Sequence, residues 1–366
     1  MPENHPKNDF LDLPRPVRKE DTFNEDKLLT YLKQVLPHLE GPLEVRQFPS
    51  GHSNLTYLLR MKDQDLVLRR PPRGKEIKTA HDMEREYRVL SSLQEVYPRV
   101  PRPLVYCEDP EVLGAPFYIM ERIQGVILRG KEPPARILLT EDVMRQLCCR
   151  MVDHLVELHK VDLVESGLRD FGKPEGYIQR QVTGWTKRYF NAKTDSIPKI
   201  EQTAAWLKET MPVEERDALI HNDYKYDNLV LDPQDLTRIM AVLDWEMATV
   251  GDPFMDVGTT LGYWLDPQDP DPIKMLPFGP TLMRGNLDRA HLVERYENGY
   301  GLPMAHPVFY YVYGLFKIAV IAQQIYKRYK DGFSQDKRFA MMILGVQILG
   351  DQAILAIEKG RIYDLG

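Results

Sequence analysis

Two short polar runs joined by a hydrophobic segment constrain this chain more than any other feature. The first reads HNDYKYDN over His221–Asn228, and the second reads VLDWE over Val242–Glu246. They place Asp223, then Asn228 five residues later, then Asp244 sixteen residues further on. In phosphoryl-transfer sites an Asp orients the attacking hydroxyl, while an Asn and a second Asp hold Mg²⁺ at the nucleotide phosphates. The spacing therefore predicts such a site, with Asp223 as base or orienting carboxylate and Asn228 and Asp244 as metal ligands.

An ordinary polar turn is the competing interpretation of the first run. Asp and Asn are common in surface loops, and one eight-residue match carries a real false-positive risk. Apolar strands, however, flank the loop at Leu219–Ile220 and Leu229–Leu231. A further apolar strand, Arg238–Leu243, ends at Asp244 and brings this second acid to the same place. A surface turn would not need a second acid on a buried strand. We therefore favour the catalytic interpretation.

Composition limits the class of protein and its partners. With 366 residues, 43% apolar and 28% charged, the chain suits two lobes of a soluble globular protein. Its net charge of −6 predicts no attraction to nucleic acid or to an anionic membrane, and three cysteines without metal-ligand spacing favour a reducing, cytoplasmic setting. The apolar stretch Val308–Ile321 is interrupted by Lys317 and is shorter than the ~20 residues of a membrane span, so we expect a core helix.

The order of the expected elements indicates an α+β fold with two lobes. After a polar tail, residues 1–22, a helix, three strands, a helix and two strands give the order of a kinase N-lobe, an antiparallel sheet plus a helix, over 23–120. A hinge at 121–125 leads to a mostly helical C-lobe, 126–366, with the catalytic loop and the acceptor site. The predicted strands of the N-lobe are 43–48, 55–60, 66–69, 104–107 and 117–120, and the predicted helices are 25–39, 78–93, 142–159, 179–189, 198–211, 287–298, 307–329 and 337–358. Gly299 is expected to end the helix that begins at Leu287.

A loop between the first two strands is a candidate for covering the nucleotide phosphates. Its residues are Ser50, Gly51, His52, Ser53 and Asn54. A Gly and short side chains let backbone N–H groups approach phosphate oxygens. A simple hairpin turn is the alternative, because the loop has one glycine instead of three. The loop's position before a strand that ends in Arg69 favours the phosphate-binding interpretation.

Arg69 and Arg70 stand on the third strand, where protein kinases carry a phosphate-binding Lys. Strand alternation puts Arg69 on the Val67 face, so we assign the role to Arg69 and keep Arg70 as the alternative. An Arg can bind phosphate bidentately. The expected partner of Arg69 on the following helix is Glu86, or Glu84; an ordinary surface ion pair is the other interpretation.

Two further positions complete the expected site. The segment 117–125 passes from apolar to polar and ends in Gly, which fits a strand leading into an inter-lobe hinge, although any strand followed by a turn has this pattern. The residues expected to contact adenine are Met120, Glu121 and Ile123. Lys225, two residues after Asp223, is placed to neutralise charge on the transferred phosphoryl group; a solvated surface Lys is the alternative.

These motifs resemble the aminoglycoside phosphotransferase and choline kinase superfamily over about residues 25–358. Within it, five segments are similar to the kinase domain fused to some acyl-CoA dehydrogenases and to free-standing bacterial kinases of 4-hydroxyacyl-CoA thioesters such as 4-hydroxyvaleryl-CoA. The segments are Phe48–Tyr57, Val67–Pro72, Glu84–Leu90, Leu158–Asp162 and Leu243–Pro253. That branch includes an Arg at the third-strand position, as here.

The resemblance implies ATP and Mg²⁺ as cofactors, a bilobal protein-kinase-like fold and a small-molecule hydroxyl as acceptor. We expect the acceptor to be a 4-hydroxyacyl-CoA, and we expect a functional partnership with an acyl-CoA dehydrogenase. Basic and aromatic residues of one helix would suit the phosphate and adenine of CoA. They are Arg180, Trp185, Lys187, Arg188 and Tyr189. The alternative explanation of each of these residues is a helix with a solvent-exposed basic face.

Other functions stay open at the level of sequence. One alternative is an aminoglycoside, choline or sugar kinase. Aminoglycosides are polycations and would favour an acidic acceptor site, and the proline-broken run Asp266–Pro272 is the local hint of one. The same run also fits a simple connection between elements. A catalytically inactive, nucleotide-binding scaffold is another, but it would not need Asp223, Asn228 and Asp244 together. Nucleophilic hydrolysis finds no support, because the G-x-S-x-G elbow is absent.

Overall fold

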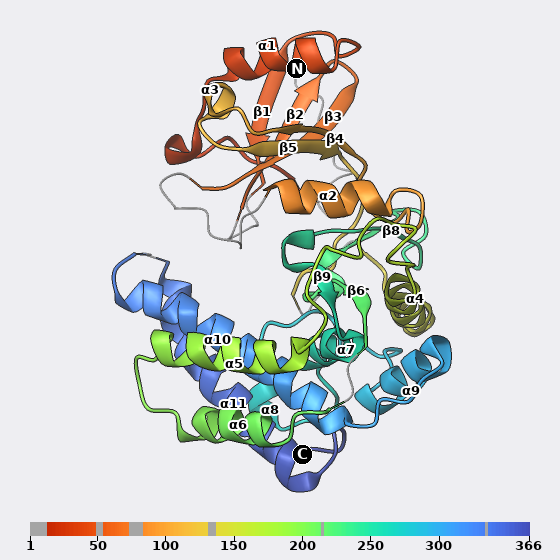
Figure 1. The fold of residues 1–366 in the computed structure, drawn as a ribbon, viewed down its shortest axis with the longest axis vertical. Helices are drawn as coiled ribbons and strands as arrows, with labels where there is room; N and C mark the ends of the chain where they lie inside the picture. Colours follow the sequence, from red (N-terminus) through yellow and green to blue (C-terminus); the bar gives the residue numbers. More distant parts are fainter. Residues whose placement is uncertain (1–12, 49–53, 73–82, 131–136, 214–215, 334–335) are drawn as a thin grey trace. The chain divides into compact units, whose positions relative to one another are not determined.

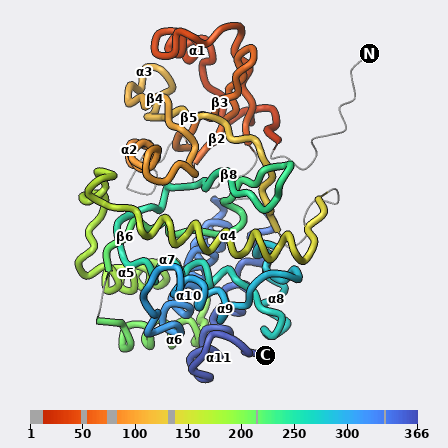
Figure 2. Tube along the Cα trace, turned by 90° about the vertical axis from the view of Figure 1, so that its right-hand side faces the viewer, coloured from red at the N-terminus to blue at the C-terminus, as the bar shows by residue number. Residues whose placement is uncertain are grey.

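The computed structural model describes residues 13–48, 54–72, 83–130, 137–213, 216–333 and 336–366 (Figures 1 and 2). Contacts divide the chain into two units. The first contains the chain up to Ile127 and, much later in the sequence, Asn228–Ala248, while the second contains Leu138–Asp227 and Thr249–Gly366. The expected lobe and hinge boundaries stay predictions.

An antiparallel sheet is the frame of the first unit. Its strands are β1 (Leu43–Gln47), β2 (Leu55–Met61), β3 (Gln64–Arg70), β4 (Pro103–Cys107) and β5 (Phe117–Glu121), and its helices are η1 (Lys19–Asp21), α1 (Glu25–Val35), α2 (Met83–Leu93) and α3 (Pro110–Leu113). The strands are hydrogen-bonded in the order β1-β2-β3-β5-β4. Helix α1 begins where the side chain of Asn24 accepts a hydrogen bond from the N–H of Lys27. The expected strands are therefore present, while residues 78–82 of the expected helix lie outside the described residues.

One face of the sheet packs against α1 to form a hydrophobic core. Leu28 and Leu32 of α1 are fully buried there. The strand residues that share this core alternate along each strand: Tyr57 and Leu59, Leu66 and Leu68, Phe117 and Ile119. Arg69, between Leu68 and Arg70, therefore belongs to the opposite face of β3, which is the face expected from the sequence.

The segment Asn228–Ala248 is tied to the first unit through its backbone. It contains β7 (Leu229–Leu231), β8 (Ile239–Val242) and η3 (Trp245–Met247), and β7 pairs with β8 antiparallel. Leu231 exchanges hydrogen bonds with Val126 at 2.8 and 2.9 Å, and Val242 N–H donates to the carbonyl of Arg99 at 2.8 Å. The Trp245 ring packs edge-on against Tyr97. These contacts fix the position of strand β8, which shortly precedes Asp244 in the sequence.

The second unit is mostly helical. Its elements are α4 (Glu141–His159), α5 (Tyr177–Ala192), α6 (Pro198–Glu209), β6 (Ala218–Ile220), η2 (Tyr226–Asn228, which continues into the first unit), β9 (Thr249–Gly251), α7 (Pro253–Gly262), α8 (Asp271–Lys274), α9 (Arg289–Tyr300), α10 (Pro307–Lys330), η4 (Lys337–Met341) and α11 (Met342–Lys359). Helix α10 packs against α5, α6, α7 and α11. Gly258 of α7 and Gly314 of α10 allow the closest approach, because a Cβ on either would collide with the backbone of the other helix. The α+β fold class expected from the sequence is confirmed.

Two details of the helices differ from the sequence-based expectation. Helix α9 ends at Gly301, whose φ of 90° is left-handed, and not at Gly299, which lies inside the helix. Helices α7 and α8 were not anticipated. Among the described residues, Pro307–Lys330 and Lys337–Lys359 are long and apolar enough to cross a membrane, by those two criteria alone. The apolar side chains of Pro307–Lys330 are largely buried in the second unit, as expected of a core helix.

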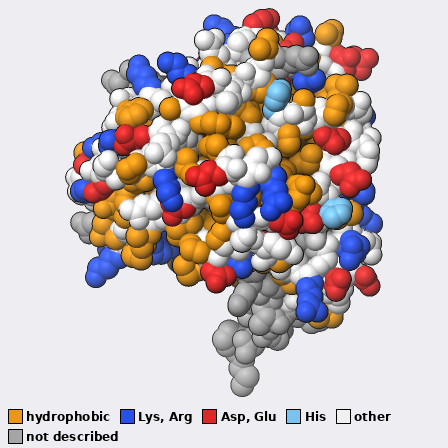
Figure 3. Space-filling view, turned by 90° about the horizontal axis from the view of Figure 1, so that it is seen from below, with side chains coloured by type: hydrophobic (Ala, Val, Ile, Leu, Met, Phe, Trp, Pro, Cys, Tyr) orange, Lys and Arg blue, Asp and Glu red, His pale blue; other side chains and the backbone are white. Residues whose placement is uncertain are grey.

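Charged side chains of both signs are interspersed with apolar ones on the face drawn in Figure 3. Among the residues described there, neither sign gathers into one large patch. This distribution agrees with the small net charge of −6.

Candidate active site

Arg69 lies among acidic residues of the first unit, on the face of β3 away from the core. Its Nη1 is 2.9 Å from Oε1 of Glu86 on α2, and its Nη2 is 3.0 Å from Oδ1 of Asp244. A carboxylate oxygen of Glu246 lies 3.7 Å from the same Nη2. Glu86 is buried and Glu84 is exposed, so Glu86 is the partner on α2. The expected Arg–Glu pair is thus formed, with two more acids beside it.

Arg70 occupies a different environment from Arg69. Its guanidinium lies 5.9 Å from the ring centroid of Phe23, and its Nε is 3.4 Å from the carbonyl of Pro71. It is buried on the core side of the sheet, with Leu68. Of the two arginines, Arg69 is the one that the structure groups with Glu86.

Electrostatics keep Arg69 charged. Burial by itself lowers the pKa of the Arg69 guanidinium, but the carboxylates of Glu86 and Asp244 raise it, and the net pKa is well above its ordinary value. Burial has the opposite effect on the Glu86 carboxyl. It raises the pKa of Glu86, and the positive charge of Arg69 opposes that rise. A buried, charged guanidinium beside partly exposed Asp244 is suited to bind an anion.

Asn228 and Asp244 lie at the same end of the β7–β8 pair. Leu243 N–H donates to the carbonyl of Asn228 at 2.8 Å, so the two chain segments are directly adjacent. Asp244 has a left-handed φ of 68°, a conformation that Asp tolerates better than most residues, and its side chain is partly exposed. The Asn228 side chain is buried.

These two residues fit a phosphate-bound magnesium ion. Mg²⁺ in nucleotide sites takes oxygen ligands from one or two side chains and completes its shell with phosphates and water. Asn228 and Asp244 supply one amide oxygen and one carboxylate. Within the described ranges, no group of three or more His, Cys, Asp or Glu side chains is arranged to hold a metal ion.

The structure describes some, but not all, of the remaining residues predicted for the nucleotide site. Ser50, Gly51, His52 and Ser53 lie outside the described residues. Asn54 is buried, and its Nδ2 donates to Oε2 of Glu246 at 3.0 Å. Met120 and Glu121 close strand β5, and the N–H of Glu121 donates to the carbonyl of Arg102 at 2.9 Å, so that N–H is used within the protein. Ile123 follows the strand and is partly exposed.

Glu246 was missed as a site residue by the sequence analysis. It contacts both Arg69 and Asn54. A signal was available, since the second motif carries an acid two positions after Asp244 where protein kinases carry Gly. A side chain there had no obvious role until the structure placed it beside Arg69.

Asp223 belongs to the second unit and forms a close pair with Lys225. The Lys225 Nζ lies 2.9 and 3.0 Å from the two carboxylate oxygens of Asp223, and 4.4 Å from the ring centroid of Tyr263. Burial lowers the pKa of Lys225, whereas Tyr263 and Asp223 raise it, and the net pKa is above its usual value. Lys225 is therefore a charged partner of Asp223 and not a solvated surface lysine.

The backbone before Asp223 is held by a buried carboxylate of α7. The two oxygens of Asp256 accept hydrogen bonds from the N–H groups of His221 and Asn222, both at 2.7 Å. The Nε2 of His159 lies 3.2 Å from Asp256 as well. Burial raises the pKa of Asp256, but His159 and the backbone lower it, and the net pKa is below its usual value. An anionic Asp256 thus anchors the loop that carries Asp223.

Aromatic side chains lie next to the Asp223–Lys225 pair. Tyr263 follows α7, and Phe278 packs edge-on against it with ring centroids 5.2 Å apart. Phe278 is partly exposed. Two aromatic rings therefore lie on the Lys225 side of the Asp223–Lys225 pair, together with the Asp227 carboxylate, which acts on both Lys225 and Tyr263.

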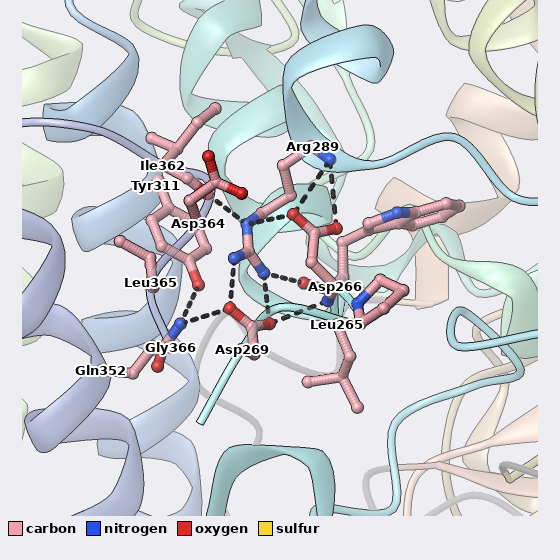
Figure 4. A network of polar contacts seen from close by, with 12 residues as sticks. Leu265, Asp266, Asp269, Arg289, Tyr311, Gln352, Ile362, Asp364, Leu365 and Gly366 are labelled. Carbon is pink, nitrogen blue, oxygen red and sulfur yellow. Dashed lines mark hydrogen bonds and ion pairs between the residues drawn. The ribbon is translucent and has the colours of Figure 1, made fainter. Parts of the chain in front are cut away.

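The acidic run Asp266–Pro272 is a structural element, which corrects its interpretation as a simple connection (Figure 4). Both nitrogens of the Arg289 fork bind the carboxylate of Asp269, Nη1 at 2.7 Å, and the Arg289 N–H donates to Asp266 at 3.2 Å. Gln352 of α11 donates to Asp269 at 2.9 Å. Because Asp266 and Asp269 are buried against a cation, they do not offer an acidic pocket to a polycation.

The proposed CoA-binding group on α5 is also corrected. Trp185 and Tyr189 are buried in the second unit, and the guanidinium of Arg188 lies 4.4 Å from the Trp185 ring centroid. The guanidinium of Arg180 donates to the carbonyls of Lys173 and Glu175. The aromatic members therefore face the core, and the five residues do not form one exposed surface.

Comparisons with known proteins place this geometry in context. Residues 44–303 match the family described as "Phosphotransferase enzyme family". Acyl-CoA dehydrogenase family member 10 of Mus musculus is 39% identical over 332 residues, which cover 86% of this chain and 29% of that protein. Acyl-CoA dehydrogenase family member 11 of Gallus gallus is 34% identical over 86% of this chain and 41% of that protein. The chain thus spans less than half the length of these relatives.

A solved structure supports the same assignment. A protein from Ralstonia eutropha, provisionally assigned as an aminoglycoside phosphotransferase, is 31% identical and superimposes with a TM-score of 0.76. The match covers 91% of this chain and 99% of that one. The resemblance and the kinase-like fold inferred from the sequence are both confirmed.

Proposed function

This chain belongs to the phosphotransferase enzyme family, and we propose that it transfers the γ-phosphoryl group of ATP, with Mg²⁺, to a hydroxyl of a small molecule. The observation that carries this proposal is the grouping of Arg69, Glu86 and Asp244 in the first unit. A buried arginine between carboxylates can be structural, as Arg289 is. The group at Arg69 differs because its Asp244 is partly exposed and lies next to Asn228, which suits binding of nucleotide phosphates and a cation.

Arg69 would bind the nucleotide phosphates and Glu86 would orient it. The guanidinium has five N–H donors in a fixed fork, so it can retain Glu86 while exchanging its contact with Asp244 for a phosphate oxygen. Asn228 and Asp244 would then hold Mg²⁺, which supplies charge neutralisation at the phosphates when bound. The loop at 50–54 would cover the phosphates, and Met120, Glu121 and Ile123 would border the adenine.

Asp223 would act on the acceptor. As the new O–P bond forms and ADP leaves, Asp223 orients the acceptor hydroxyl and accepts its proton, while Lys225 balances the charge of the transferred group. The transition state of phosphoryl transfer is loose, so the expected contribution of these side chains is positioning and charge stabilisation. The Lys225 amine lies 2.9 Å from the Asp223 carboxylate, which supports a shared role at the acceptor.

For the acceptor we propose a 4-hydroxyacyl-CoA such as 4-hydroxyvaleryl-CoA. The relatives named acyl-CoA dehydrogenase family members support a CoA thioester and a functional partnership with such a dehydrogenase. The cytoplasmic setting is a separate proposal, which rests on the three cysteines without metal-ligand spacing. The aromatic side chains of Tyr263 and Phe278 beside Lys225 suit an acyl chain. The engagement of Asp266 and Asp269 by Arg289 disfavours a polycationic aminoglycoside.

An acceptor panel tests the proposal. ATP consumption is measured with 4-hydroxyvaleryl-CoA, 4-hydroxyvalerate, choline, a sugar and kanamycin side by side. We expect turnover of the thioester and much poorer turnover of the free acid, because binding energy from the remote CoA moiety contributes to positioning the hydroxyl. Activity on choline, a sugar or kanamycin alone would overturn the proposed acceptor but would leave the proposed kinase activity standing. Binding of Mg·ATP without turnover of any acceptor would favour an inactive scaffold.

A further inference from the structure

Lys317 is a buried cation in the middle of the apolar helix α10. It is 1% exposed, and a charge at such a position is costly unless it is well paired. Its Nζ donates to the backbone carbonyl of Asn222 at 2.6 Å and lies 3.2 Å from Oδ1 of the same residue. Thr259 of α7 is a third, longer contact at 3.5 Å. The lysine therefore directs its hydrogen bonds chiefly at Asn222.

Asn222 immediately precedes Asp223 and holds an unusual backbone conformation. Its φ of 68° is left-handed. The N–H of Asn222 donates to Asp256 at 2.7 Å, and its amide group lies within hydrogen-bond distance of the Tyr177 hydroxyl, with Nδ2 at 3.1 Å. Lys317 binds the carbonyl at the other end of the residue. The peptide that joins Asn222 to Asp223 is thus oriented by Lys317.

Several charges face the Lys317 amine from the elements around it. They are Asp256 on α7, Asp223 and Lys225 on the loop, and Arg188 on α5. Burial lowers the pKa of Lys317 to about 8, although Asp256 and Asp223 oppose that shift. The lysine therefore changes its charge just above neutral pH.

We propose that Lys317 is a positioning residue for phosphoryl transfer, because its hydrogen bonds to Asn222 fix the left-handed turn that holds Asp223 in place for the acceptor hydroxyl. The proposal rests on the proposed function and deepens it. The hydrogen bonds of Lys317 go to Asn222 and Thr259, which are neither proposed metal ligands nor residues of the first unit. Its loss should therefore affect the transfer step and spare nucleotide binding.

The decisive variant is Lys317→Met, which keeps an unbranched side chain one atom shorter and removes its donors and charge. Its matched control is Gln323→Met on the same helix. Gln323 is also buried, and its Nε2 donates at 2.9 Å to the carbonyl of Ala192 and to the hydroxyl of Thr194, away from the loop. We expect kcat of Lys317→Met to fall about 10²-fold with KM for ATP unchanged, as for a small misplacement of a catalytic group, and kcat of Gln323→Met to stay near wild type.

Two further readouts separate positioning from general destabilisation. In hydrogen–deuterium exchange, the peptide spanning His221–Tyr226 should exchange faster in Lys317→Met and not in Gln323→Met. In the pH profile, wild-type kcat should decline as pH rises through about 8, where Lys317 loses its charge, and Lys317→Met should lack this decline. Wild-type kcat in Lys317→Met, or an equal loss in Gln323→Met, would overturn the proposal.

A second variant covers failure of Lys317→Met to fold. Lys317→Gln keeps an N–H donor without the charge, and we expect it to lower kcat and to remove the decline near pH 8. A Lys317→Gln enzyme with wild-type kcat and an unchanged decline would contradict the role of Lys317. If the wild-type protein phosphorylates no acceptor, the proposed function fails, whereas the exchange experiment still decides whether Lys317 holds the loop.

Discussion

The Nη2 of Arg69 lies 3.0 Å from Oδ1 of Asp244, although 175 residues separate them in the sequence. The contact joins strand β3 to the turn after β8 within the first unit. Under the proposed function, Arg69 would bind phosphate and Asp244 would bind magnesium, so the contact would bring the two parts of a metal–nucleotide site together. The predictions for the nucleotide site follow from it.

Replacing Asp244 tests the metal site. Asp244→Asn removes one carboxylate ligand and its charge, so we expect turnover to be abolished and Mg·ATP affinity to fall. Calorimetric titration of Mg·ATP measures the affinity. Asp271→Asn, at a carboxylate that is 93% exposed, is the control and should bind as wild type does. Unchanged affinity together with an unchanged rate would remove Asp244 from the site.

Replacing Asp223 separates the transfer step from nucleotide binding. Asp223→Asn keeps the size of the side chain and loses its basicity, so kcat should fall by ~10²–10⁴-fold while ATP affinity stays near that of wild type. Steady-state kinetics and nucleotide titration on the same preparation provide both values. A variant that retains most of its kcat would exclude this loop as the catalytic loop.

The two arginines of β3 should behave differently. Arg69→Ala should raise KM for ATP and lower kcat, since it removes the proposed phosphate contact. Arg70→Ala should leave both constants close to wild type but lower the free energy of unfolding by about 0.5–3 kcal/mol, because Arg70 is buried beside Phe23. Kinetics and chemical denaturation test the pair. The reverse kinetic result would mean that Arg70 holds the phosphates.

The buried network around Arg289 should contribute to stability and not to catalysis. Asp269→Ala leaves the Arg289 charge without its bidentate partner, and we expect a loss of roughly 3–5 kcal/mol in the free energy of unfolding. The control is Asp153→Ala, which breaks a partly exposed pair with Arg295 and should cost about 0–1 kcal/mol. Denaturant unfolding measures both. Equal losses would show that burial of the Arg289 network is unimportant.

The sequence predicted the parts of this protein that depend on local pattern. Alternation along β3 correctly separated Arg69 from Arg70, because each strand residue points to the face opposite its neighbours. The spacing from Asp223 to Asn228 placed them on one short loop, and the apolar strand before Asp244 was found. Glu86, with Glu84 as the alternative, was expected by analogy with the glutamate that protein kinases carry on the helix after the third strand, and Glu86 is the one that pairs with Arg69.

The errors arose where distant residues decide the outcome. Asp266 and Asp269 were interpreted as part of an acidic connecting loop. Their partner Arg289 lies some twenty residues away, and no pattern in the sequence near them predicts the pairing. Gly299 and Gly301 both suit a helix end, and only the backbone φ distinguishes them. The spacing of Trp185 and Tyr189 was, by contrast, a readable core pattern that we interpreted as a binding surface.

The most direct test of the central claim is identification of the phosphorylated product. The wild-type protein and Asp223→Asn are each incubated with Mg·ATP and 4-hydroxyvaleryl-CoA, and the thioester is analysed by mass spectrometry alongside ADP. The account predicts that the wild-type protein yields a thioester carrying one phosphoryl group on its hydroxyl, with one ADP formed per product, and that Asp223→Asn yields almost none. ADP formation without a phosphorylated thioester, or equal product from Asp223→Asn, would contradict it.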